Sequence, residues 1–309
     1  MTSISLFSPA TIANVSCGFD SLGFAIDNLG DQMTFTKTLS KHVEIKKITG
    51  AKLTLSPKDN VAGAVAIAML KHASAKFGVS ITIHKGFHPG SGLGSSAASA
   101  AGAAVGINAL LNNKYSKLEL TKFAMLGEKL ACGSEIADNV AAAIFGGFIL
   151  VRSYAPLEIV SLPSPSELRL VAIHPQIEIR TEDARQVLPK QIPLQDAVTQ
   201  WANVGGFISG LYSNNYNLIS NSLMDVIVEP ARKHLIPYFN EVKQKALSAG
   251  ALGAGISGAG PTIFALCKGD AVAEEVYQSI RQEYSTKNIP FTMIKSNISH
   301  HGVKIMSQT

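Results

Sequence analysis

The sequence has little cysteine, and its cysteines stand far apart. Cys17, Cys132 and Cys267 are the three in 309 residues, and none belongs to a C-x-x-C pair or a Cys/His group. This spacing excludes a zinc-ligand motif, and an odd number of isolated thiols does not make a disulfide framework. Free thiols persist in reducing compartments. We therefore predict three free cysteines and a cytoplasmic location.

The sequence also lacks a membrane-spanning run and a strongly charged region. Its most apolar stretches, 97–111 and 140–151, are too short and too rich in glycine to cross a bilayer, and the N-terminus does not resemble a signal peptide. Charged residues make up 16%, and the net charge of +5 comes from scattered residues. We therefore expect neither a membrane nor a nucleic acid as partner, and a small anionic molecule fits better.

What the chain does have is enough apolar side chains for a large core. Hydrophobic residues make up 46% of the 309 residues, which excludes long disorder, and a chain of this length is long for a single core. A proline-rich stretch, 156–165, separates the predicted strands 148–151 and 168–174. We therefore predict two domains, residues 1–160 and residues 161–309.

A glycine-rich loop precedes the most alanine-rich stretch of the chain. Gly90, Gly92 and Gly94 alternate, Ser95 and Ser96 follow, and a helix is predicted from there to about residue 111. Glycine allows positive φ and the close approach of a ligand, and the amino end of a helix attracts anions. The glycines alone fit a structural turn before a buried helix equally well. The two serines, which are good N-cap residues, favour a phosphate-binding loop.

The loop matches neither of the two commonest nucleotide-binding motifs. The P-loop requires a lysine after its last glycine, and no lysine follows Gly94. The dinucleotide fingerprint requires a third glycine at position 95, which is a serine. A second stretch, Gly253–Pro261, contains G-x-G-x-x-G, but a predicted helix precedes it and a strand follows it. This order is wrong for a dinucleotide site, so we reject a nicotinamide-dependent oxidoreductase.

Glu128 has an unfavourable position in its predicted helix. The capping box Ser116–Glu119 begins that helix, which is predicted to end near Ala131. A carboxylate in the last turns of a helix opposes the helix dipole. The placement points to a cation partner, although an exposed side chain is the more frequent outcome for glutamate.

Three motifs, taken in order, resemble those of the GHMP kinases, a superfamily of small-molecule kinases. They are Pro9–Asp20, Gly90–Ser99 and Gly255–Pro261, and they extend over nearly the whole chain. The resemblance implies an α+β, two-domain fold, with an N-terminal ribosomal-S5-domain-2-like αβ domain and a C-terminal ferredoxin-like α+β sandwich. Within the superfamily, the chain is most similar to the bacterial homoserine kinases in the segments 14–20, 138–140, 181–189 and 229–237.

That resemblance implies transfer of the ATP γ-phosphate, with Mg²⁺, to the side-chain hydroxyl of L-homoserine, which gives O-phospho-L-homoserine in threonine biosynthesis. Under it, Ser96 and Glu128 hold Mg²⁺, which usually takes one or two protein oxygens. Asn60 and Val61 match positions beside the adenine in relatives. The resemblance assigns the ATP phosphates to the loop residues His88, Pro89, Gly90, Ser91, Gly92, Leu93, Gly94, Ser95, Ser96, Ala97 and Ala98. A homodimer follows from the family resemblance alone.

On the substrate side, the resemblance points to residues in three further segments. Arg185 and Arg232 match the carboxylate-binding arginines of the family, and a guanidinium fork suits a carboxylate. Without the family, either arginine would more often be a solvated surface residue. Asn14 and Asp20 match residues that contact the hydroxyl and amino groups of homoserine, and Thr181 matches a residue near the γ-phosphate.

Asn139 completes the substrate-binding set and determines the expected chemistry. Mevalonate kinase and galactokinase have an aspartate there, their proposed base, and an asparagine cannot accept a proton in that way. We therefore expect catalysis by positioning and electrostatic stabilisation, with Asn139 and Asp20 as catalytic residues and Asp20 as the nearest candidate base. Ile136 replaces a histidine usual in homoserine kinases, which affects one substrate contact. The alternatives are another GHMP kinase and a non-catalytic ligand sensor of that superfamily.

Overall fold

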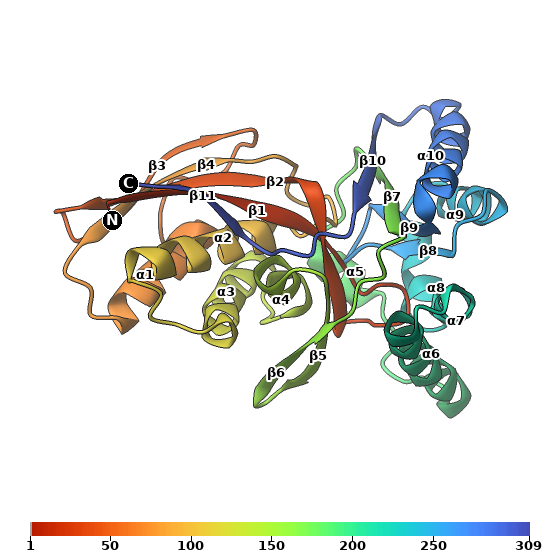
Figure 1. Ribbon diagram of the computed structural model, residues 1–309. Coiled ribbons are helices and arrows are strands. Elements are labelled where there is room, and N and C mark those ends of the chain that lie inside the picture. The colour runs from red at the N-terminus through yellow and green to blue at the C-terminus, as the bar shows by residue number, and fades with distance from the viewer. Residues whose placement is uncertain (1) are drawn as a thin grey trace.

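One half of the molecule is built on a seven-stranded sheet and holds the C-terminal end of the chain beside the N-terminal strand (Figure 1). In the computed structural model, which describes residues 2–309, the strand order is β11-β1-β2-β4-β3, and β5 pairs with β2 and β6. Neighbouring strands are antiparallel except β3 and β4. The strands are β1 Ser3–Ala13, β2 Leu22–Thr38, β3 Val43–Thr49, β4 Gly78–His84, β5 Phe148–Tyr154, β6 Leu157–Leu162 and β11 Lys304–Gln308.

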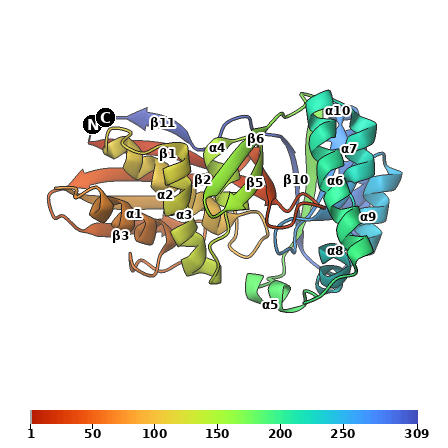
Figure 2. The same cartoon turned by 90° about the horizontal axis from the view of Figure 1, so that it is seen from below.

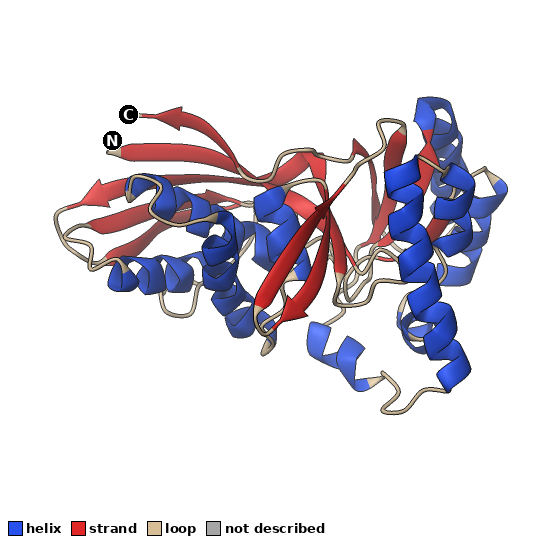
Figure 3. Cartoon of the chain, turned by 60° about the horizontal axis from the view of Figure 1, so that its bottom comes forward, coloured by secondary structure: helices blue, strands red, loops and turns tan. Residues whose placement is uncertain are grey.

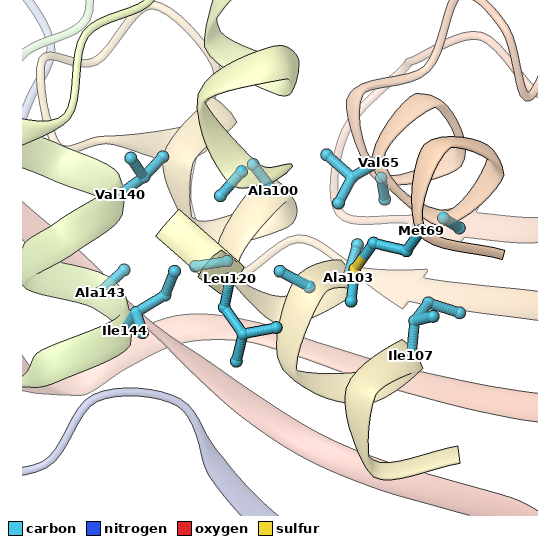
Figure 4. Close-up of a cluster of buried hydrophobic side chains, with 14 of the residues drawn as sticks. Val65, Met69, Ala100, Ala103, Ile107, Leu120, Val140, Ala143 and Ile144 are labelled. Carbon is cyan, nitrogen blue, oxygen red and sulfur yellow. The ribbon is translucent and has the colours of Figure 1, made fainter. Parts of the chain in front are cut away.

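Four helices cover one face of this sheet (Figures 1 and 2). They are α1 Val61–His72, α2 Ser95–Leu110, α3 Lys117–Cys132 and α4 Asp138–Phe145. The predicted alanine-rich helix is α2, which lies between the sheet and the other three helices and is buried along nearly its whole length. Ala100 and Ala103 face Val65, Met69 and Leu120 of the neighbouring helices (Figure 4). Small side chains are needed there because α2 is packed on several sides at once.

The second half of the molecule is built on a four-stranded antiparallel sheet of order β10-β7-β9-β8. Its strands are β7 Leu168–Pro175, β8 Gly253–Ile256, β9 Ile263–Lys268 and β10 Phe291–Asn297. Helices α9 (Phe239–Ser248) and α10 (Gly269–Ser285) pack on one face of the sheet. The opposite face of β7 and β9 contributes Leu170 and Phe264 to a core shared with the first half. The predicted α+β class is confirmed.

That shared core fixes how the two halves meet. Ile12, Phe24 and Phe148 come from strands of the first sheet, and they share one cluster of buried residues with Leu170 and Phe264. Because apolar contact is continuous across the junction, loops from both halves are held at fixed positions beside it.

Further helical segments lie between β7 and α9 in the chain. They are α5 Thr181–Gln186, α6 Leu194–Ser213, α7 Tyr216–Ser222, α8 Val228–Arg232 and the 3₁₀ turn Lys233–Leu235. Short α5 lies between the two halves (Figure 2), whereas long α6 packs on α7 at the outside of the molecule (Figure 3). Among residues 2–309, no helix combines the length and the apolar character that crossing a bilayer requires.

The last strand departs from the predicted division into residues 1–160 and 161–309. The predicted boundary falls within β6, and β11 pairs with β1 of the first sheet. The chain returns there because Ile298 forms a β-bridge with Ile26, and the Ser299 N–H donates to Ala25 O. The domain boundary therefore stays a prediction, while the C-terminal strand belongs to the first sheet.

Candidate active site

A cavity of about 700 Å³ lies where loops of the two halves meet. Segments far apart in the sequence form its wall, among them the 14–20 turn, the glycine loop, the end of α3, the start of α4 and α5. Of the predicted site residues, the cavity brings together Asn14, Asp20, Pro89, Gly90, Gly92, Gly94, Ser95, Ser96, Glu128, Asn139, Thr181, Arg185 and Arg232.

The backbone of the loop explains its alternating glycines. Gly90, Gly92 and Gly94 have φ of 73°, 79° and 71°, in the left-handed region that other residues avoid. A Cβ on Gly92 would lie 2.7 Å from the carbonyl oxygens of Ser257 and Gly260. Glycine is required at this position both for its conformation and for the close approach of another backbone.

The predicted capping role of the two serines is wrong. Gly94 is the N-cap of α2 in a left-handed conformation, and Ser95 is already the first helical residue. No side chain of residues 2–309 caps α2, and the Ser95 hydroxyl is buried without a hydrogen-bond partner there. The amino end of α2 is therefore uncapped at the cavity wall, which suits an anion.

The second glycine stretch holds the loop. Ser257 Oγ donates to Gly92 O at 2.6 Å, and Thr262 Oγ1 donates to Ser91 O at 2.6 Å. Both hydroxyls are fully buried. These bonds orient two carbonyl groups of the loop toward the second half of the molecule. The second glycine stretch and the residue after it therefore hold the loop in place.

A buried ion pair supports the loop from behind, and sequence reasoning missed it. Lys85 pairs with Asp31, and its ammonium also donates to Ser95 O at 2.8 Å and to Ser99 Oγ at 3.0 Å. Both ion-pair partners are buried. A lysine directly after a strand gives no signal of this role, because Asp31 is distant in the sequence.

Glu128 faces the cavity and is nearly buried. The predicted capping box begins α3, and Glu128 lies in its last turns with 7% of its surface exposed. Its Oε1 has no hydrogen-bond partner among residues 2–309. Burial raises the pKa of the Glu128 carboxyl to about 7, and the Ser96 hydroxyl acts in the opposite direction. A carboxylate with one unpartnered oxygen, beside a hydroxyl, is a donor set that fits a hard cation such as Mg²⁺.

The 14–20 segment makes a tight left-handed turn. Asn14, Val15 and Ser16 have φ of 70°, 42° and 60°, which is costly for the β-branched Val15. Asn14 Nδ2 donates to Gly258 O at 2.7 Å, and Asn14 Oδ1 accepts from the Asp20 N–H at 3.1 Å. The turn thus places Asp20 at the cavity and joins the first half of the molecule to the second.

The two predicted arginines lie together on the far side of the cavity. Arg185 Nη2 donates to both carboxylate oxygens of Asp20, at 2.8 and 2.9 Å. Arg232 is 2% exposed, and its guanidinium donates to Ala184 O and Gly258 O. Both guanidinium groups lie over the ring of Phe19, at 5.5 and 5.0 Å from its centroid. The alternative of solvated surface arginines is therefore wrong for Arg232.

The two arginines bring two positive charges close together in this region. Burial and, to a smaller extent, the neighbouring Arg185 lower the pKa of Arg232 to about 10, while Asp20 acts in the opposite direction. Two adjacent guanidinium groups, of which only Arg185 is paired directly with a carboxylate among the described residues, favour a further anion beside them. Phe19 was not among the predicted residues, although an aromatic residue beside Asp20 is a signal that could have been used.

At the start of α4, Asn139 lies beside a second buried carboxyl. Thr11 Oγ1 donates to Asn139 Oδ1 at 2.6 Å, and the Asn139 N–H donates to Asp138 Oδ1 at 2.7 Å. Burial, with a smaller effect from the charge of Asp20, raises the pKa of Asp138 to about 7. Sequence reasoning treated Asp138 only as part of a motif, and its burial at the cavity depends on the packing of α4.

Several predicted nucleotide contacts lie outside the cavity wall. Asn60 caps α1: its Oδ1 accepts from the N–H groups of Ala62 and Gly63, and its Nδ2 donates to Thr54 O. The adenine role of Asn60 and Val61 stays a prediction. The loop and helix residues that do not line the cavity are His88, Ser91, Leu93, Ala97 and Ala98.

Comparison with known proteins agrees with this geometry. The model of the GHMP kinases N terminal domain matches residues 60–147, and the GHMP kinases C terminal model matches residues 207–286. The two-sheet fold, with a glycine loop at the amino end of a buried helix, is thus that of a GHMP kinase.

Individual relatives narrow the family. A homoserine kinase of Chlorobium phaeovibrioides is 43% identical, over 99% of this chain and 100% of the relative. The crystal structure of homoserine kinase from Cytophaga hutchinsonii has a TM-score of 0.95 and 47% identity, over 99% of this chain and 98% of that one. Mevalonate kinase of L. major, at 15% identity, shares the fold with a TM-score of 0.71 over 94% of each chain. The chain belongs to the homoserine kinase family of the GHMP kinases.

Proposed function

We propose that the protein is a homoserine kinase: it transfers the γ-phosphate of ATP to the side-chain hydroxyl of L-homoserine and forms O-phospho-L-homoserine, a step of threonine biosynthesis. One observation carries this proposal beyond family membership. A single cavity joins an uncapped helix end with a glycine loop on one side and two adjacent arginines on the other. The first suits phosphates, and the second suits the carboxylate of an amino acid.

On the nucleotide side, we assign the loop backbone and the amino end of α2 to the ATP phosphates. Ser96 and Glu128 would hold Mg²⁺, since the buried Glu128 oxygen lacks a protein partner and a hydroxyl lies beside it. When bound there, Mg²⁺ would neutralise charge on the phosphate oxygens.

On the substrate side, we assign Arg185 and Arg232 to the homoserine carboxylate and Asp20 to its ammonium group. Asn139 would orient the reacting hydroxyl, and Thr181 at the start of α5 would contact the transferred phosphate. Asn14 already uses its amide group in two hydrogen bonds, so its second N–H and one lone pair of Oδ1 are left for the substrate.

Catalysis would then depend on positioning. The homoserine hydroxyl oxygen bonds to the γ-phosphorus, the bond to the leaving ADP oxygen breaks, and the hydroxyl proton is released. A loose transition state needs little help from a base. Asn139 cannot act as a base, and the Asp20 carboxylate is already bound by Arg185, so orientation by Asn139 and charge stabilisation are the expected contributions.

A substrate panel tests the function. ADP release is measured by a coupled assay with homoserine, mevalonate, galactose and shikimate, and the phosphorylated product is identified by ³¹P NMR. We expect kcat/KM to be highest for homoserine. Higher activity with another alcohol would indicate a different GHMP kinase, and binding of homoserine without turnover would indicate a ligand sensor.

We also propose a homodimer and a cytoplasmic location. The outer face of α6 supports the first: Leu194, Val198, Trp201 and Tyr212 are exposed there, and Asp196 is the only charged residue of this helix. Light scattering of the wild type and of Trp201→Ser after gel filtration tests it, and a monomeric wild type would contradict it. The free state of all three cysteines supports a reducing compartment.

A further inference from the structure

Helix α6 lies outside the cavity, yet one of its side chains ties two cavity elements together. Gln200 Nε2 donates to Cys17 O at 2.9 Å and to Asp225 Oδ1 at 3.0 Å, and Gln200 Oε1 accepts from the Val226 N–H at 3.0 Å. Cys17 belongs to the turn that presents Asp20, and Asp225 precedes the helix that carries Arg232. The whole amide group of Gln200 is therefore engaged in joining these two segments.

Asp225 in turn organises the start of α8. Its Oδ1 accepts from the N–H groups of Ile227 and Val228, and its Oδ2 accepts from the N–H of Glu229, each at 2.9 Å. With Gln200, the carboxylate accepts four hydrogen bonds while it is only 9% exposed. Charged acceptors make stronger hydrogen bonds than neutral ones, so this carboxylate is a firm anchor for the segment.

Arg232 needs such an anchor because α8 is too short to hold it alone. The helix has five residues, and Arg232 is the last of them. A single turn is not stable by itself in water, since nucleating a helix costs more than one hydrogen bond returns. Arg232 is also next to the like charge of Arg185, above the same ring of Phe19. Its fixed position therefore depends on contacts made elsewhere in the chain.

We propose that Asp225 and Gln200 are positioning residues for the substrate carboxylate: Asp225 fixes α8 and so Arg232, and Gln200 fixes α8 relative to the 14–20 turn. Neither side chain would touch homoserine. This inference rests on the proposed function, because it assumes that Arg232 binds the carboxylate. Loss of the anchor would weaken homoserine binding and leave nucleotide binding unchanged. The reason is that preorganisation would be lost only on the arginine side.

A graded pair of substitutions tests the role of Asp225. Asp225→Ala removes all four accepted hydrogen bonds, whereas Asp225→Asn keeps an oxygen for those at Oδ1. We expect Asp225→Ala to raise KM for homoserine about tenfold or more, the effect of losing hydrogen bonds to a charged group. Asp225→Asn should lie between it and the wild type, with kcat and KM for ATP within about twofold of the wild type in both variants.

Two control variants separate this role from a general loss of stability. Asp270→Ala removes an aspartate from the first turn of α10, where it binds Arg169 on the surface, and Gln244→Leu on α9 is the counterpart of Gln200→Leu. Urea unfolding is measured for all variants. Gln200→Leu should raise KM for homoserine and the controls should not. If Gln200 contributed to folding alone, Gln200→Leu would lower stability and leave KM for homoserine unchanged. That result would overturn the proposal even if Asp225→Ala failed to fold.

A double-mutant cycle on kcat/KM for homoserine gives the deciding measurement. If Asp225 acts through Arg232, adding Asp225→Asn to Arg232→Ala should change kcat/KM by less than about twofold. The same substitution in the wild type should lower kcat/KM by more than that. Equal effects in the two backgrounds would overturn the positioning role. If Arg232→Ala itself left KM for homoserine unchanged, the proposed carboxylate site would be wrong, and that failure is distinct from a failure of Asp225 alone.

Discussion

The two sides of the cavity meet their ligands in opposite states. On the nucleotide side, polar atoms lack partners: among residues 2–309, neither Glu128 Oε1 nor Ser95 Oγ has one. On the arginine side, most charged groups already have partners, because Arg185 Nη2 binds Asp20 and Arg232 donates to two carbonyl oxygens. Among residues 2–309, only Arg185 Nε of these two guanidinium groups is buried without a partner. Under the proposed function, the nucleotide side would accept a cation and phosphates directly, whereas Arg185 and Asp20 would exchange partners with the substrate.

This difference explains why a zwitterion suits the arginine side. An amino acid brings one carboxylate and one ammonium group, so it can replace each partner of the Arg185–Asp20 pair without leaving a charge uncompensated. A simple hydroxy acid would supply only the carboxylate and leave Asp20 without its cation. Selection for homoserine over mevalonate would therefore come from the pair as a unit.

The largest effect should come from a change in the glycine loop on the nucleotide side. In Gly92→Ala, kcat/KM for ATP should fall about 1,000-fold. Strain from the positive φ should account for about tenfold of this loss, and displacement of the loop for about 100-fold. The matched control is Gly269→Ala, since Gly269 has a φ of 77° and nothing within 4 Å of the added Cβ. Steady-state kinetics compare the two, and equal losses would show that only φ strain matters.

The next largest effect should fall on the arginine side alone. Arg185→Ala and Arg232→Ala should each raise KM for homoserine about 100-fold, the cost of removing one charge from a desolvated pair. KM for ATP should change little. Arg281→Ala, an exposed position on α10, is the control for the loss of one positive charge. A rise of equal size in both KM values would contradict the carboxylate assignment.

A smaller effect should sharpen the assignment of the cation. Ser96→Ala should raise the Mg²⁺ concentration for half-maximal rate about tenfold, because one hard oxygen ligand is lost. Titration of activity with MgCl₂ at fixed ATP measures this shift, and Ser134→Ala, in the loop after α3, is the control. An unchanged titration curve would remove Ser96 from the metal site.

The smallest effect is expected where the two sides meet. Asn139→Ala removes the acceptor of the Thr11 hydroxyl and should lower kcat about fivefold, the effect of one neutral hydrogen bond. Single-turnover rates measure the chemical step, and Asn217→Ala, exposed on α7, is the control. A loss above about 100-fold would instead indicate general base catalysis through this position.

Local features of the sequence predicted the elements around the glycine loop better than they predicted the placement of the two arginines. The glycine loop, the buried alanine helix and the capping box of α3 follow from backbone conformations and from contacts within a few residues. The capping role of the serines was wrong because Gly94 takes the cap position in a left-handed conformation. For the arginines, residue type alone favoured the surface, and only the family resemblance indicated a binding site.

The sequence by itself determined where the chain turns and which helix has side chains small enough for close packing, because φ preferences and side-chain size act locally. Tertiary structure alone decided that Glu128 is buried without a partner, that Lys85 supports the loop, and that Gln200 joins two distant segments. Burial and pairing depend on which segments meet across the junction of the two sheets. That meeting is fixed by the shared core, where each contact joins residues far apart in the chain.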